Sequence, residues 1–215
     1  MKRFSVGALA IAALTVSGCG GGVREDRRGA GPPPPTTREF QQCVGDLSRE
    51  GIRFRALPDQ QFGGGCSATG AVQLLDIGVP VTNLGAMRCG LARTFAAWIR
   101  YGAQPAARQI LGSELVRVES MGTYACRNVI GGRGPARLSG HAIANAADVG
   151  AFVLADGRRI SVKYGWTSAD PSEREFLQVV RRSACRRFGT VLSPDYNAAH
   201  ADHLHVEADT ASFCR

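Results

Sequence analysis

The stretch SGHAIANAAD, residues 139–148, places His141 seven residues before Asp148, and Asp148 opens an apolar run. A second stretch, DHLH at residues 202–205, carries two more histidines. The chain has four histidines, and three of them, His200, His203 and His205, lie within six residues. Imidazole and carboxylate are the usual ligands of catalytic zinc where free thiols are lacking. The two stretches therefore predict a Zn²⁺ site.

Local geometry supports this site. Residues i and i+2 of a strand point to one face, so His203 and His205 are expected to project together. A loop that carries His141 can fold back over a strand that begins at Asp148. Three protein ligands and one water form the usual catalytic zinc site. Such a metal lowers the pKa of the water to about 7 and polarises a scissile carbonyl, while a nearby carboxylate accepts the proton.

Both stretches resemble motifs of the LAS metallopeptidases. Residues 139–148 resemble the motif S-x-H-x-x-G-x-A-x-D, and residues 202–205 resemble the second motif, D-H-x-H. That group includes D-Ala-D-Ala carboxypeptidases, VanX dipeptidases and murein endopeptidases. From about Phe40 to Cys214 the chain also resembles the bacterial extensin-like C-terminal family, which is placed with these peptidases.

The resemblance implies a role for each motif residue. His141, Asp148 and His205 would bind zinc. Asp202 would be the general base, and His203 would orient it or stabilise the developing oxyanion. Asp148 could instead only cap a turn. His203 could instead only hold a metal ligand in place. A regular strand would direct Asp202 away from both histidines, so the base role requires Asp202 to precede the strand.

Further polar residues are candidates for the same site. Arg127 matches a family arginine that contacts the substrate or the transition state, although it could instead pair with a surface acid. Ser139 resembles a serine that contacts the substrate or fixes the loop. Glu207, on the strand face of His205, is a rival for the base. His200 is expected to be a loop residue or a partner of a ligand.

The chain departs from the family pattern at Ala144, where the motif has glycine. If this position needs a positive φ, a β-carbon there costs about 1 kcal/mol. We expect a shifted loop with the metal site retained, since every proposed ligand is present.

The N-terminus has the features of an export signal. Lys2 and Arg3 precede an apolar run from Val6 to Val16, which is shorter than the roughly 20 residues of a membrane-spanning helix. The following VSGC resembles a lipobox, which predicts a lipoprotein signal peptide at residues 1–18 and a lipid on Cys19. A plain secretory signal is the alternative. Gly20, in place of aspartate, favours the outer membrane, and hence a periplasmic location in the cell envelope.

Residues 19–38 are rich in glycine and proline and lack an apolar period, which predicts a tether. The folded domain is predicted at residues 39–215. Six cysteines remain after Cys19, and their even number in an exported chain predicts disulfides. A thiolate metal site is disfavoured because the sequence has no closely spaced cysteine pair. The six are Cys43, Cys66, Cys89, Cys126, Cys185 and Cys214.

Helices and short strands mix without a regular βαβ alternation, which predicts an α+β fold. The resemblance to the LAS metallopeptidases implies a small antiparallel sheet with flanking helices. Helices are expected from Phe40 to a stop at Gly51 and over residues 86–100 and 171–188, the last capped by Asp170. Strands are expected over residues 52–56, 115–120, 148–154, 159–163 and 204–207, and a turn at residues 63–65.

These features predict a zinc peptidase that cuts peptidoglycan stem peptides or cross-links at bonds involving D-amino acids. The 215-residue chain has 44% hydrophobic residues, which suits a globular domain. Its charge of +8 suits an anionic wall, and the lipid would provide contact with the membrane. The alternative is a wall-binding lipoprotein that keeps the fold without catalysis. No motif or basic-aromatic stretch supports nucleic-acid binding.

Overall fold

The computed structural model describes residues 1, 32–130 and 136–215. The predicted signal peptide, Cys19 and the first part of the tether lie outside the described residues. Helix α1 (Thr37–Arg49) begins with a capping box between Thr36 and Glu39, so it starts inside the segment predicted as tether. The preceding prolines also contact the domain, since Arg88 donates to the carbonyl oxygens of Pro32 and Pro33 at 2.8 and 3.1 Å.

Three further helical segments follow one another without a break. They are α2 (Cys89–Trp98), the π-helix η1 (Ile99–Ala103) and α3 (Gln104–Leu111). The predicted helix over residues 86–100 was therefore wrong at both ends. Met87 belongs to a strand, because it pairs with Val72. Pro105 does not stop the helix: it lies in the first turn of α3, directly after the wider turn of the π-helix η1.

Helix α5 (Pro171–Cys185) begins as predicted, with the side chain of Asp170 accepting from the backbone N–H of Ser172 at 2.8 Å. It ends three residues earlier than predicted. A short helix, α4 (Val162–Gly165), follows the strand β9, so Lys163 lies in a helix and not in the predicted strand.

The main sheet has seven strands in the order β12-β10-β11-β8-β7-β5, with β9 also paired to β8. Its strands are β5 (Val81–Thr82), β7 (Leu115–Gly122), β8 (Ala146–Leu154), β9 (Arg159–Ser161), β10 (Thr190–Leu192), β11 (Leu204–Glu207) and β12 (Phe213–Cys214). The pairs β5–β7 and β10–β12 are parallel and the others antiparallel. The chain is thus a mixed α/β protein, and the expected small antiparallel sheet is corrected to a larger mixed one.

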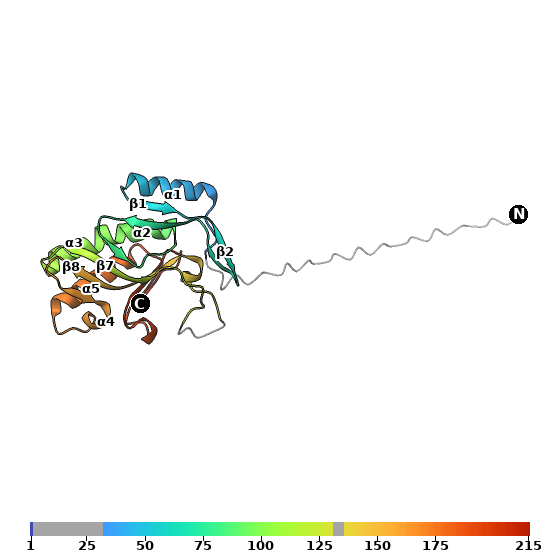
Figure 1. Ribbon diagram of the computed structural model, residues 1–215. Helices are drawn as coiled ribbons and strands as arrows, with labels where there is room; N and C mark the ends of the chain where they lie inside the picture. Colours follow the sequence, from blue (N-terminus) through green and yellow to red (C-terminus); the bar gives the residue numbers. More distant parts are fainter. Residues whose placement is uncertain (2–31, 131–135) are drawn as a thin grey trace.

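Two smaller sheets complete the fold. One joins β1 (Arg53–Ala56), β4 (Ala71–Asp76) and β6 (Met87–Arg88), and α1 packs on it beside β1 (Figure 1). The other is a hairpin of β2 (Gln60–Gly63) and β3 (Cys66–Ala68). Its turn has positive φ at Gly63, Gly64 and Gly65, which confirms the predicted turn.

Helices cover one face of the main sheet and bury its side chains. Phe152 of β8 packs edge-on against Phe176 of α5, with the ring centroids 5.2 Å apart. Val149 and Phe152, three residues apart, are both fully buried in this core. Strict alternation would place them on opposite faces. They share a face because β8 has one extra residue, Gly150, between the pairs Glu119–Ala151 and Ser120–Val149.

Three disulfides confirm the predicted disulfide framework. Cys43–Cys89 joins α1 to α2, Cys66–Cys126 joins β3 to the segment before the first motif, and Cys185–Cys214 joins the end of α5 to β12. Within the described residues, no helix has the length and apolar character needed to cross a bilayer.

Candidate metal centre

The proposed ligands lie on the face of the main sheet opposite the helices. Asp148 on β8 and His205 on β11 are directly paired across the two strands, so their side chains project side by side. His141 lies in the short 3-10 helix η2 (Gly140–Ile143), which leads into β8. The two distant motifs therefore meet, as their sequences predicted.

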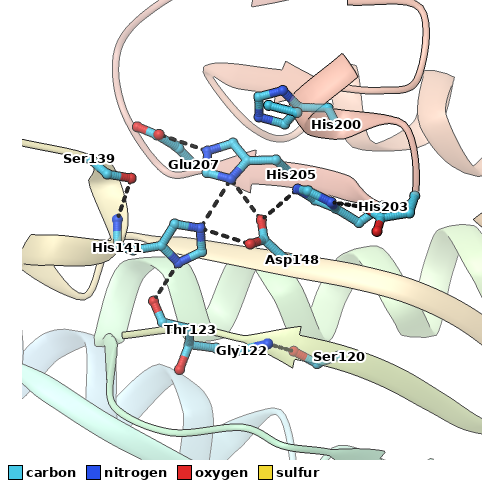
Figure 2. Close-up of polar contacts among 12 residues, drawn as sticks. Ser120, Gly122, Thr123, Ser139, His141, Asp148, His200, His203, His205 and Glu207 are labelled. Atoms are coloured by element: carbon cyan, nitrogen blue, oxygen red, sulfur yellow. Dashed lines mark hydrogen bonds and ion pairs between the residues drawn. The ribbon is translucent and has the colours of Figure 1, made fainter. Parts of the chain in front are cut away.

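One nitrogen of each imidazole and both carboxylate oxygens of Asp148 converge between these residues (Figure 2). Nε2 of His141 is 3.2 Å from Nδ1 of His205 and 3.1 Å from Oδ2 of Asp148, and Nδ1 of His205 is 2.8 Å from Oδ1 of Asp148. Ligand bonds of about 2.0–2.1 Å in a tetrahedron place the ligand atoms about 3.3 Å apart. The triangle of donors therefore fits a zinc ion with a small expansion.

The other nitrogen of each imidazole is held by a hydrogen bond. His141 donates from Nδ1 to the carbonyl oxygen of Thr123 at 2.9 Å, and His205 donates from Nε2 to Glu207 at 2.7 Å. These bonds leave Nε2 of His141 and Nδ1 of His205 facing Asp148, where each can bind a metal after losing any proton that it holds. Both rings are almost fully buried, so their orientations are set before any ion binds.

Two carboxylates, the buried Asp148 and the partly buried Glu207, give the centre a negative charge. Burial alone would raise the pKa of Asp148, but hydrogen bonds from His141 and His205 hold that pKa well below its ordinary value. Burial also opposes ionisation of Glu207, whose pKa is nevertheless lowered by His205. Burial disfavours the charged form of His205, yet its hydrogen bonds with both carboxylates raise its pKa to about 9. A metal ion would therefore displace a proton from His205.

His203 lies beside this triangle and Asp202 lies behind His203. Nε2 of His203 is 3.6 Å from Oδ1 of Asp148, and its Nδ1 donates to Oδ1 of Asp202 at 2.8 Å. Asp202 is in the turn before β11, with 47% of its side chain exposed. Asp202 therefore precedes the regular strand, as its predicted role beside His203 and His205 requires.

His200 closes the other side of the cluster. It ends the 3-10 helix η3 (Ala198–His200) and donates from Nδ1 to Oδ1 of Asn197 at 2.7 Å. Its ring centroid lies 5.2 Å from that of His203 and 5.7 Å from that of His205. Burial lowers the pKa of His200 to about 4, so the ring is neutral at pH 7. Together these three histidines form a second group with ligand atoms within 4.8 Å of one another.

Arg127 and Ser139 take different places around the centre. Nη2 of Arg127 is 4.0 Å from Oδ2 of Asp148, and 36% of its side chain is exposed, so the guanidinium lies between the ligands and solvent. Ser139 is buried and its hydroxyl accepts from the backbone N–H of His141 at 3.3 Å. Of the two roles considered for Ser139, the geometry favours fixing the loop.

Ala144 has a positive φ, which is the case considered above for its position in the motif. Its φ is 54° and its ψ 29°, and its methyl group is fully buried against Ala68 and Ala71. The backbone N–H of Ala144 bonds to the carbonyl oxygen of His141 at 3.1 Å. Alanine therefore keeps the left-handed turn, and the three donors still converge.

Sequence reasoning missed part of this arrangement. The bond to Thr123 uses a backbone carbonyl, so no side chain marks it. Glu207 was recognised by its strand spacing from His205, but as a rival base and not as the partner of a ligand. Gly140 gave no signal, although a β-carbon there would lie 2.6 Å from Cδ of Glu207. The absence of a side chain at Gly140 therefore makes room for that carboxylate.

Fold and site together define a mixed α/β protein with a buried histidine–carboxylate cluster that is suited to a divalent metal. The profile of the family described as "Extensin-like protein C-terminus" matches residues 41–215, well over half of the chain. The chain belongs to this extensin-like family. No curated protein and no solved structure matches the chain.

Proposed function

We propose that this protein is a zinc-dependent peptidase that cuts peptide bonds in peptidoglycan. The observation that carries the proposal is the convergence of His141, Asp148 and His205, with donor atoms 2.8–3.2 Å apart. The hydrogen bonds to Thr123 and Glu207 add support, because such partners orient histidine ligands in metal sites. These three residues would hold the ion.

Zinc bound there would supply a Lewis acid that polarises a carbonyl and makes a water nucleophilic near pH 7. His203 presents Nε2 to the centre and donates from Nδ1 to Asp202. This orientation favours His203 as the group that moves the proton and Asp202 as the residue that orients it. The order is the reverse of the sequence-based prediction, in which Asp202 was the base.

Arg127 would contact the substrate. Its guanidinium lies beside Asp148 and is partly exposed, so it can approach a bound peptide from the solvent side. A cation in this position suits a terminal carboxylate or an oxyanion that develops on the carbonyl under attack.

The substrate is inferred from the two motifs and from the predicted location. The motifs at residues 139–148 and 202–205 resemble those of LAS peptidases, several of which act on bonds involving D-amino acids. The three disulfides suit an oxidising compartment outside the cytoplasm. A lipid on Cys19 would anchor the protein in the outer membrane and hold the domain in the periplasm, within reach of the peptidoglycan.

The test is to incubate the full chain and zinc with purified muropeptides and to identify the products by mass. Release of terminal D-Ala would define a carboxypeptidase, and conversion of dimers into monomers an endopeptidase. His141→Ala and His205→Ala should each lose both zinc and cleavage, whereas Arg182→Gln, on the exposed side of α5, should retain them. Intact substrates after incubation with zinc-loaded wild-type protein would contradict the proposal.

A wall-binding lipoprotein without catalysis is the second candidate. The observation in its favour is Ala144, which replaces the motif glycine at a residue with φ 54°. This candidate predicts that the wild-type protein binds muropeptides, leaves them intact, and folds fully without metal.

A further inference from the structure

A groove of about 630 Å³ runs along the outer face of the main sheet and ends at Asp202, next to the candidate metal centre. Its wall at that end is Asp202, which holds His203. Its other polar lining comes from β7, β9 and α4, chiefly Arg117, Glu119, Arg159 and Lys163. None of these four residues contributes to the centre itself.

The bulge at Gly150 brings the groove and the centre to one face. Glu119 is paired with Ala151, and Ala151 is paired with Ser161, so these side chains share a side of the sheet. Asp148 would lie on the opposite side if β8 alternated regularly from Ala151. Because the extra residue shifts the alternation, the groove and the donor atoms lie on the same face of the sheet.

The groove carries an excess of positive charge away from Asp202. Arg117 and Arg159 both pair with Glu119, at 3.2 and 2.7 Å, which leaves this triad one positive charge. Lys163 adds a second. Across the described parts of the chain, no carboxylate lies within 4 Å of the Lys163 ammonium group, which instead lies 5.3 Å from the ring centroid of Tyr164.

Apolar side chains in the same groove offer contacts for the rest of a peptide. Tyr164 is 71% exposed and Met121 is 51% exposed, and both line the groove. Met121 lies over Gly150, where an added β-carbon would be 3.2 Å from its sulfur. An open groove with exposed apolar and cationic groups suits an extended peptide more than a compact ligand, because compact ligands bind in concave, mostly apolar pockets.

We infer that this groove binds an extended peptide segment with free carboxylates and aligns it with the metal centre. Lys163 and Arg159 pair with a carboxylate of the peptide, and Tyr164 and Met121 contact its backbone and apolar groups. The inference rests on the proposed function in one respect: the bound peptide is taken to be the acidic part of the stem peptide that the enzyme cuts. Its binding chemistry is independent of catalysis.

Binding without cleavage is the direct test. The full chain is titrated, in the presence of a metal chelator, with fluorescent L-Ala-γ-D-Glu-L-Lys-D-Ala and with the same peptide amidated at both carboxylates. The acidic form should bind about three- to tenfold more tightly, as expected for a partly exposed charge pair. Lys163→Gln and Arg159→Gln should remove this preference, and Arg182→Gln should keep it. Equal affinity for the two peptides, or no binding of either, would overturn the inference.

A labelling experiment uses the composition of the chain. Apart from Lys2 in the predicted signal peptide, Lys163 is the only lysine of the chain, so an amine-specific acylating reagent followed by mass spectrometry of the processed protein reports on the groove. The acidic peptide should slow acylation of Lys163 severalfold relative to the amidated peptide, which carries the same amines and is the control. Unchanged acylation of Lys163 under saturating peptide would overturn its assigned contact.

The groove and the hydrolase activity can fail separately. Preferential binding of the acidic peptide without cleavage of any muropeptide would support the groove and refute the peptidase. Cleavage of acidic and amidated muropeptides with equal KM and equal kcat would support the peptidase and refute the groove. In a protein with both properties, Lys163→Gln raises KM for the acidic substrate and leaves kcat nearly constant.

Discussion

Replacing Glu207 by glutamine tests whether the hydrogen bond behind His205 controls metal affinity. Glu207 accepts from Nε2 of His205 at 2.7 Å and is largely buried. A hydrogen bond to a charged group contributes about 1.5–3 kcal/mol, and glutamine keeps the shape and an acceptor but removes the charge. Loss of such partners typically lowers metal affinity by about 10- to 100-fold. We therefore expect Glu207→Gln to weaken zinc binding within that range.

The assay is competition for zinc against a chromophoric chelator of known affinity. Glu119→Gln is the matched control, because it removes a carboxylate from the same face without touching a proposed ligand. Gly140→Ala should reproduce the loss, since its β-carbon would displace the Glu207 side chain. Wild-type affinity in Glu207→Gln would refute the reasoning. If Glu207→Gln binds zinc normally but has a much lower kcat, Glu207 is the general base, the role for which Asp202 was the other candidate.

Three further predictions concern charge, backbone and proton transfer. In the presence of a metal chelator, the free energy of unfolding should fall by about 3 kcal/mol as the pH rises from 6.5 through 9. The reason is that folding raises the pKa of His205 from 6.5 to about 9, so the folded state loses a stabilising proton over this range. Urea titrations at several pH values measure this change, and a stability that does not vary with pH would contradict it. Ala144→Gly should change stability by less than about 1 kcal/mol, because relief of φ strain offsets a lost buried methyl group, whereas Ala144→Val should destabilise by more than about 2 kcal/mol in the same urea assay. His203→Gln should retain zinc and lower kcat by about 100-fold or more in the muropeptide assay; near-normal kcat would remove His203 from proton transfer.

Local sequence signals predicted the elements whose pattern does not depend on the rest of the fold. The Asp170 cap located the start of α5, and strand β11 coincides with the predicted residues 204–207. The predicted start of the helix over residues 86–100 was wrong because an apolar residue such as Met87 suits a helix or a strand equally. Only its pairing with Val72 places it in a strand. The parallel pairings of β5 and β12 depend on contacts between distant segments, which periodicity does not encode.

The sequence predicted which side chains form the candidate site, but not the backbone groups that hold them in position. The chain has only four histidines, so their spacing is informative. The carbonyl of Thr123 and the space at Gly140 act through backbone geometry, which leaves no comparable signal in composition. The orientation of Asp202 behind His203 likewise follows from the turn before β11, a detail that alternation alone does not give.

The single extra residue in β8 has a consequence for how this architecture tolerates change. Removing Gly150 would restore strict two-residue periodicity and rotate one half of the strand by half a turn about its axis. Either the hydrophobic side chains around Phe152 would then point to water, or Asp148 would turn into the helical layer. Inserting or deleting two residues in this strand therefore keeps each side chain on its face of the sheet. Inserting or deleting one residue moves the side chains of one half of the strand to the opposite face.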